Sequence, residues 1–427
     1  MLKHRWSILA LLLFTRGTMG FQFQSIAAFA PLIGRDLGLT PAQTGSLIGL
    51  YMLPGVVLAL PAALVGRWLG AKRAALLALA LMAAGGFGLA ASAGFTGSSG
   101  ITANSGFTAS SGFAVAALAR LAGGAGMVLL NVLLTKTVAD RFAGRESATA
   151  MALLLAVWPA GIALALATLG GLASTAGWPL AAAVTGAWPL AALLGMAVLY
   201  PGAGRPAPAR AMQTDAAQTD AVQPGAAPPG AATQRQPMLA RSLLLGSAAG
   251  WAWTLYNCGF IALVSFLPAL LLSRGAGLGE AGLISSFVTW GLMLGTPAGG
   301  ALADGSGKPR AVVLFACVAG AALIGLAGLG NSPLHFLALG FCIGLPAGPI
   351  MAMLGQALPE RERGLGYGVL LSWYYAGLAV TPALGGLVLQ ATGTPVSILA
   401  LSAALVLATF PVYQGFHWLR GRLEAAA

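Results

Sequence analysis

The stretch "GALADGSGKPR", from Gly300 to Arg310, gathers charge in a chain that is otherwise strongly apolar. Its G-S-G-K run suggests a phosphate-binding loop, which needs a Gly five residues before the Gly-Lys pair and a Ser or Thr after the Lys. Those positions hold Leu302 and Pro309, so the sequence does not predict a nucleotide loop. The stretch instead joins two long apolar segments, and Asp304 within it needs another explanation.

The apolar segments indicate a membrane protein. The 427 residues are 58% hydrophobic and 7% charged, with a mean hydropathy of +0.85, whereas about 25% of the residues in a soluble domain are charged. About 20 apolar residues are enough to cross the roughly 30 Å of hydrocarbon in a bilayer. The sequence therefore predicts twelve membrane-spanning helices, over residues 6–33, 41–66, 73–93, 113–137, 147–171, 178–200, 241–272, 281–302, 310–330, 334–357, 364–390 and 395–416.

The basic residues are distributed unevenly around these spans. The formal net charge is +12, and 18 of the 22 Lys and Arg fall on the side of the two termini, against only Arg35 and Arg274 on the other side. This bias predicts cytoplasmic termini, so membrane topology explains the basicity and a nucleic-acid partner is not expected. The first segment could also be a cleaved signal peptide, but Arg16 interrupts it and another span follows at once, which favours a retained helix.

The chain is an internal duplication. An offset of 237 residues aligns Phe29 with Phe266 and Pro31 with Pro268, and a later offset of 216 aligns Gly124 with Gly340. Such a parallel repeat predicts two six-helix bundles, residues 1–200 and 241–427, with a substrate site between them. The 21 extra residues of the first half fall in a Gly/Ser-rich segment, 94–112, which we expect to be a flexible outer loop. The Pro- and Gln-rich residues 201–240 predict a disordered cytoplasmic linker.

The opening stretch also occurs in the first half, as "AALVGRWLGAKR" at residues 62–73, where Gly70 is kept and Arg67 replaces the acid. Two further patterns are "RLAGGAG" at 120–126 and "GLAVTPALGG" at 377–386. With the duplication and the topology, these motifs resemble the major facilitator superfamily over essentially the whole chain. The matching positions of the second-half motif are Gly300, Leu302, Asp304, Gly307, Lys308 and Arg310.

The resemblance implies an all-α membrane fold that works by alternating access, and a gating role for the motif. Asp304 would face the beginning of the fifth span, where the helix dipole and Arg145 favour a negative charge. In the other half Arg67 would face the beginning of the eleventh span, which carries Glu360 and Glu362. We therefore expect two ion-pair latches of opposite polarity. In one the motif supplies the acid, Asp304, and in the other the motif supplies the base, Arg67.

Two arginines lie within predicted spans, Arg16 in the first and Arg120 in the fourth, whereas all ten acids fall in loops, at span ends or in tails. An arginine within the bilayer costs at least about 2.5 kcal/mol and normally faces a cavity or a partner. Because guanidinium groups bind carboxylates and phosphates bidentately, the substrate is predicted to be a small anion held by both arginines. Alternatively, backbone carbonyls or the neighbouring Gln22 and Gln24 satisfy them.

Helical spacing extends this candidate site. Asn131 lies on the face of Arg120, eleven residues further along, and Gln24 is a further candidate in the span of Arg16, about 80° off the stripe of that arginine. The repeat aligns Arg16 with Trp253 and Arg120 with Phe336, so the second half offers rings where the first offers charge. An aromatic group in spans 7, 8 and 11 contains the remaining cavity candidates, Trp253, Asn257 and Tyr374, together with Trp251, Tyr256, Trp290, Trp373 and Tyr375.

The sequence thus predicts a monomeric secondary transporter of a small anion in a bacterial inner membrane. The resemblance points to carriers of small acids such as oxalate, cyanate or nitrate. The three histidines lie in loops or tails, which favours anion exchange or facilitated movement over carboxylate-driven proton symport. An antiporter that exports drugs or metabolites is the alternative, favoured by the eleventh-span pattern and the aromatic group. No catalytic, cofactor or metal constellation is visible, so an enzyme is not expected.

Overall fold

The structure is a computed structural model that describes residues 5–59, 61–95, 101–102, 108–109, 111–142, 146–200 and 231–425. The regular elements among these residues are helices, apart from one pair of two-residue strands. The elements are α1 (Arg5–Asp36), α2 (Pro41–Leu50), α3 (Leu53–Leu58), α4 (Ala62–Leu69), α5 (Ala71–Ala91), η1 (Ser92–Phe95), β1 (Ile101–Thr102), β2 (Thr108–Ala109), α6 (Ser111–Arg141), α7 (Ser147–Ala176), α8 (Trp178–Leu199), α9 (Ala231–Ser273), α10 (Leu278–Ser306), α11 (Pro309–Leu326), α12 (Pro333–Gly344), α13 (Ala347–Ala357), α14 (Glu360–Thr392) and α15 (Val396–Ala425).

The predicted twelve-helix fold is confirmed, with two spans built from shorter helices. The second span consists of α2, α3 and α4, and the tenth consists of α12 and α13. Proline explains these breaks, because it lacks the N–H that would continue a helix: Pro54 lies in the first turn of α3, and Pro61 and Pro346 directly precede α4 and α13. Within the described residues, ten helical segments are long and apolar enough to cross a membrane.

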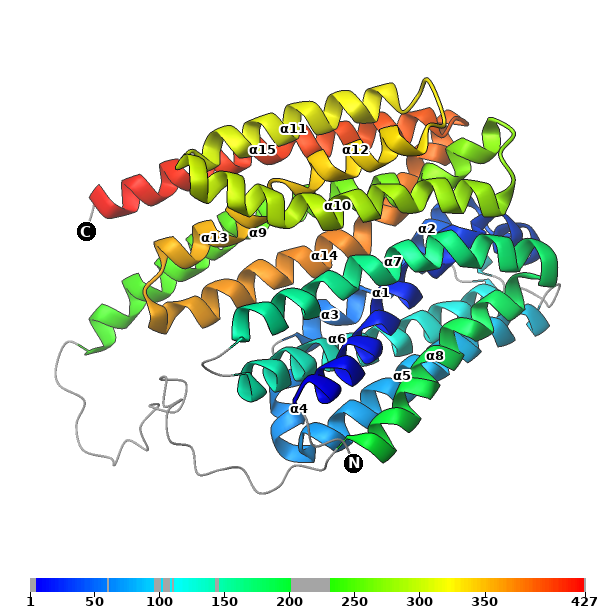
Figure 1. The fold of residues 1–427 in the computed structure, drawn as a ribbon, viewed down its shortest axis with the longest axis horizontal. Helices are drawn as coiled ribbons and strands as arrows, with labels where there is room; N and C mark the ends of the chain where they lie inside the picture. The colour runs from blue at the N-terminus through cyan, green and yellow to red at the C-terminus, as the bar shows by residue number, and fades with distance from the viewer. Residues whose placement is uncertain are drawn as a thin grey trace.

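The helices form two bundles with matching internal contacts, drawn in the lower and upper parts of Figure 1. In the first half α1 packs on α7 and α5 packs on α6 and α8. The repeat-related helices do the same in the second half, where α9 packs on α14 and α11 packs on α12 and α15. The two halves meet mainly where α7 packs on α10 and α2 packs on α14.

Close backbone contacts between the halves lie near one face of the membrane. We call the face on which α1 begins the terminal face, and the face on which α1 ends the opposite face. A Cβ on Gly45 of α2 would lie 2.0 Å from the carbonyl oxygen of Pro382 on α14, and one on Gly282 of α10 would lie 2.2 Å from that of Leu166 on α7. All four residues are in the parts of their helices near the opposite face. The halves are therefore closed together on that side.

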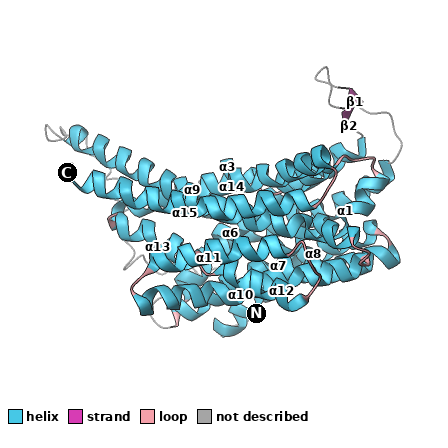
Figure 2. Ribbon diagram, turned by 90° about the horizontal axis from the view of Figure 1, so that it is seen from above, coloured by secondary structure: helices cyan, strands magenta, loops and turns pink. Residues whose placement is uncertain are grey.

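Two boundaries differ from the sequence prediction or fall partly outside the described residues. Helix α9 begins at Ala231, so the last ten residues of the predicted linker 201–240 are helical, while residues 201–230 lie outside the described residues. The predicted outer loop 94–112 is described only in part. It contains the pair β1–β2, in which Ile101 faces Ala109, and this pair lies outside the helical body (Figure 2).

Candidate functional site

A cavity of about 460 Å³ lies between the two halves. On α7 it is lined by residues 155–162 and on α14 by residues 371–375, in both cases nearer the terminal face than the close contacts between the halves. The cavity is therefore separated from the opposite face by the closed part of the interface. Its lining residues are Arg16, Met52, Met127, Asn131, Leu155, Trp158, Pro159, Ile162, Trp253, Tyr256, Asn257, Phe260, Ile261, Leu292, Thr296, Ala347, Gly348, Met351, Leu371, Tyr374 and Tyr375.

Arg16 is the only charged residue among those that line this cavity. It lies in the middle of α1 and is only 5% exposed. Its Nη1 donates a hydrogen bond of 2.8 Å to Oδ1 of Asn131 on α6. Its Nε is buried and, like Nη2, donates to no described residue. One edge of the guanidinium group thus remains available to a ligand.

The hydrogen-bond chain from Arg16 crosses to the second half. Nδ2 of Asn131 donates to the hydroxyl of Tyr375 on α14 at 3.4 Å. The ring of Tyr375 contacts that of Tyr374 with centroids 5.3 Å apart, and Tyr374 lies 6.3 Å from Trp253 on α9. The first half therefore supplies the charge, and the second half supplies an aromatic wall opposite it.

Five of the seven residues predicted to bind substrate line this cavity, namely Arg16, Asn131, Trp253, Asn257 and Tyr374. The amide nitrogen of Asn257 donates to the carbonyl oxygen of Trp253, one turn earlier in α9, at 2.8 Å. This bond fixes the orientation of its side chain.

Arg120 is not brought to the cavity, which corrects the expectation that it shares the anion with Arg16. It is 2% exposed, and its guanidinium group donates to four backbone carbonyls, those of Gln22 and Phe23 on α1 and of Leu47 and Ile48 on α2, at 2.7 to 3.4 Å. Leu47 and Ile48 are in the last turn of α2, whose carbonyls have no helical partner. Arg120 thus provides hydrogen-bond donors for the carbonyls where the second span breaks. This matches the alternative that backbone carbonyls are the partners of a buried arginine.

The environment of Arg120 completes this structural role. Its guanidinium carbon lies 4.5 Å from the centre of the Tyr51 ring, a distance that permits a cation–π contact. A positive charge at the C-terminal end of a helix is also favoured by the helix dipole. All three interactions hold α1, α2 and α6 together, so they stabilise the first bundle.

Gln24 also lies outside the cavity lining. It is fully buried, and its Nε2 donates to Oγ of Ser265 on α9 at 3.1 Å. This bond joins the two halves on the opposite-face side of Arg16, because α1 runs toward that face. Gln24 is therefore placed in the closed part of the interface.

Sequence reasoning did not select Trp158, which lines the cavity from α7. Its ring stacks on that of Phe23 with centroids 5.8 Å apart. The only local signal is the following Pro159, which lies inside α7 and also lines the cavity. A proline in a membrane helix has several structural explanations, so this signal alone could not identify a cavity residue.

The predicted gate residues lie at the terminal face. Gly70 and Gly307 both have positive φ angles, +76° and +62°, which explains why glycine occupies both copies of this turn. Asp304 is exposed and, among the described residues, has no ion-pair partner. Arg145 and the side chain of Arg67 lie outside the described residues, so both proposed latches remain predictions.

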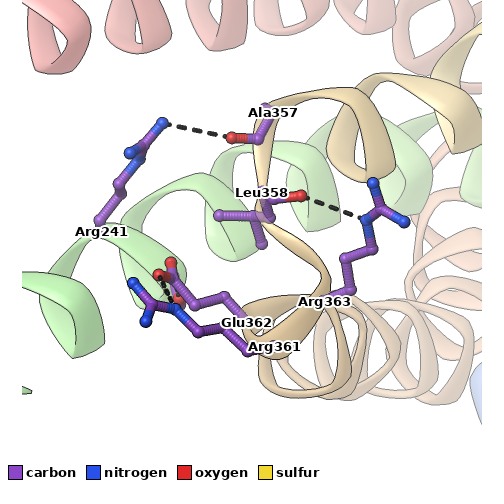
Figure 3. Close-up of polar contacts among 7 residues, drawn as sticks. Arg241, Ala357, Leu358, Arg361, Glu362 and Arg363 are labelled. Carbon is purple, nitrogen blue, oxygen red and sulfur yellow. Dashed lines mark hydrogen bonds and ion pairs between the residues drawn. The ribbon is translucent and has the colours of Figure 1, made fainter. Parts of the chain in front are cut away.

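Glu362, the predicted partner of Arg67, has contacts within its own half. It accepts a hydrogen bond of 2.9 Å from the hydroxyl of Ser242 on α9, and Nε of Arg361 lies 3.9 Å from its other oxygen. Figure 3 shows this carboxylate beside Arg361, near Arg241, which donates to the carbonyl of Ala357. Glu360 is exposed. In this state the start of α14 is thus held to α9.

Comparisons with known proteins agree with this architecture. The family model described as Major Facilitator Superfamily matches residues 12–275 and 255–422. The crystal structure of a D-xylose-proton symporter matches with a TM-score of 0.71 and 15% identity, covering 96% of this chain and 98% of the symporter. That of the nucleoside transporter NupG matches with a TM-score of 0.65 and 15% identity, covering 96% and 99%. No curated protein matches the sequence. The family match covers more than half of the sequence, and the chain belongs to the Major Facilitator Superfamily.

Proposed function

We propose that this multi-pass membrane transporter moves a small anion, and that Arg16 binds the anion in the cavity between the halves. The observation that carries the proposal is the unpartnered, buried Nε of Arg16 in a cavity whose described lining contains no other charge. A buried cation without a counter-ion is costly in a membrane protein. An anionic substrate supplies the missing charge.

The free edge of the guanidinium group defines the shape of the anion. Asn131 occupies Nη1, while Nε and Nη2 point along the other edge as two parallel donors. Two parallel donors match the two oxygens of a carboxylate or of a planar oxyanion, which they bind bidentately. The aromatic wall of Trp253 and Tyr374 accommodates an organic group attached to that carboxylate. An organic acid therefore fits the cavity best.

The state of the protein supports alternating access. The halves are closed at the opposite face by the contacts of α2 with α14 and of α7 with α10. The excess of Lys and Arg on the terminal face supports the assignment of that face to the cytoplasmic side of a bacterial inner membrane. We propose that the protein works as a monomer and that this state faces inward. Opening the opposite face would expose Arg16 to the other side.

An exporter of drugs or metabolites is the second candidate. The aromatic cavity wall and the "GLAVTPALGG" stretch on α14 favour it. A neutral solute, such as the sugar or nucleoside of the two structural neighbours, or a lipophilic cation would not need the charge of Arg16. The dependence of transport on that charge therefore separates these functions.

The test is uptake into proteoliposomes from a panel of labelled solutes: formate, acetate, oxalate, lactate, cyanate, nitrate, xylose, uridine and tetraphenylphosphonium. Each is measured with and without a pH gradient, and with unlabelled solute inside to detect exchange. We expect one or more anions to be transported, and Arg16→Lys and Arg16→Gln to abolish that transport, because neither residue forms a guanidinium fork. Arg422→Lys, a change at the end of α15, is the control. Transport of only neutral or cationic solutes, or normal anion transport by Arg16→Lys, would refute the proposal.

A further inference from the structure

A second cavity, of about 330 Å³, lies between the halves near the opposite face. The first half contributes residues of α1, of α2 and of the turn between them, and the second half contributes residues of α9 and α14. We call it the outer cavity. Its lining residues are Ala27, Ala30, Pro31, Gly34, Arg35, Leu39, Pro41, Thr44, Gly45, Ile48, Ser265, Phe266, Ala269 and Leu389.

Among the described residues that line the outer cavity, Arg35 is the only charged one. Its side chain is 86% exposed, and its one recorded ion pair is a distant one, with Nε 3.9 Å from the neighbouring Asp36. The other oxygen of Asp36 accepts a 2.8 Å hydrogen bond from Trp178 on α8. Asp36 is itself absent from the cavity lining. The charge that faces the outer cavity is thus positive.

The other arginine predicted for this face has a different environment. Arg274, in the turn between α9 and α10, donates hydrogen bonds at 2.5 to 3.1 Å to the carbonyls of Ala327, Gly328 and Gly330, which belong to the loop after α11. Its donors are used to order that loop. Of the two arginines, only Arg35 therefore offers its guanidinium group to a solute.

The two cavities are separated by a thin part of the interface. The outer cavity reaches Ser265, which accepts the hydrogen bond of Gln24, and the central cavity reaches Ile261, one turn earlier on α9. The halves also meet where a Cβ on Gly49 of α2 would lie 1.9 Å from the carbonyl oxygen of Ala379 on α14. When these contacts open, the two cavities join into one path from the opposite face to Arg16.

We propose that the outer cavity is a second anion-binding site, in which Arg35 collects the carboxylate substrate before it passes the Gln24–Ser265 contact and reaches Arg16. The proposal rests on the proposed function for the identity of the anion. The positive charge in the described lining of the outer cavity, however, is that of Arg35. It can therefore be tested without any transported substrate.

The test introduces Ala269→Cys into the outer cavity, in a protein whose Cys258, Cys317 and Cys342 are replaced by Ala. Its reaction rates are measured with two thiol reagents of the same length, a methanethiosulfonate with a sulfonate group and one with a trimethylammonium group. A nearby positive charge concentrates the anionic reagent and repels the cationic one. We expect Arg35→Gln to lower the ratio of the anionic to the cationic rate by about five-fold, and 0.5 M salt to reduce this difference through screening.

Arg35→Lys keeps the charge and should keep the ratio, while Arg422→Gln removes one charge at the terminal face and should leave it unchanged. In addition, acetate and oxalate should slow the labelling of Cys at position 269 more strongly with Arg35 than with Gln at position 35. A ratio unaffected by Arg35→Gln would overturn the outer site even if Arg16 proves to bind an anion. A changed ratio without protection by either carboxylate would leave only a positive surface and would also overturn it.

Discussion

Arg16 on α1 donates to Asn131 on α6 at 2.8 Å, although 115 residues separate them. Asn131 is therefore the fixed partner of the one charged residue in the described lining of the central cavity, and it also reaches Tyr375 in the second half. An amide has no charge, so it orients the guanidinium group without neutralising it. The positive charge remains for the substrate.

Asn131→Asp should inhibit transport by supplying Arg16 with an internal counter-ion. The introduced carboxylate would lie where Oδ1 now accepts the hydrogen bond and would compete with the anion. We expect the KM for the transported anion to rise by at least about ten-fold, which corresponds to about 1.4 kcal/mol. Initial uptake rates over a range of anion concentrations measure this. Asn131→Ala, which removes the acceptor without adding a charge, should cost less, and equal effects of the two changes would contradict the argument.

Arg120→Met should act on stability. Its side chain makes four hydrogen bonds to backbone carbonyls, and a hydrogen bond to a charged group is worth about 1.5 to 3 kcal/mol. Without the guanidinium group, the carbonyls of Gln22 and Phe23 lose a charged hydrogen-bond donor. The carbonyls at the end of α2 lose their cap. Thermal unfolding of the purified protein should shift to lower temperature for Arg120→Met and less for Arg120→Lys. Arg16→Gln, which removes one side-chain bond, is the comparison, and an equal or larger shift for it would contradict this assignment.

The different roles of the two arginines show what the sequence could and could not predict. Bilayer thickness fixes the length of an apolar span, so the twelve helices followed from hydropathy. The helical period placed Asn131 on the same stripe of α6 as Arg120, and Asn131 does line the cavity. However, Arg120 is eleven residues from Asn131, or about 16 Å along the helix. At that depth the same face packs on α1 and α2, which periodicity does not reveal.

The internal repeat predicts an ion pair that can be introduced into the second half at the terminal face. Arg5 forms an ion pair with Glu146 at 2.6 Å in the first half. In the second half the equivalent residues are Ser242 and Glu362, which are joined by a 2.9 Å hydrogen bond. Ser242→Arg should therefore recreate the ion pair, but Ser242 is only 1% exposed and the Glu362 side chain 11% exposed, so the larger side chain must displace its neighbours and we expect the melting temperature to fall. In a Glu362→Gln background Ser242→Arg has no acid to pair with, and we expect a larger fall there. An equal effect in both backgrounds would show that the two ends are not equivalent.

Gly49→Ala should favour opening at the opposite face. The new Cβ would lie 1.9 Å from the carbonyl oxygen of Ala379, and a backbone oxygen within a helix cannot move aside cheaply. Because α2 and α14 belong to different halves, relief of this overlap separates the halves. The reporter Ala269→Cys in the outer cavity should then react several times faster with a neutral thiol reagent. Gly340→Ala is the matched control, since its Cβ would lie equally close, 1.9 Å, to the carbonyl oxygen of Val288 but within the second half. Gly340→Ala should therefore lower stability without faster labelling, whereas equal labelling of both variants would mean that the contact at Gly49 does not hold the halves closed.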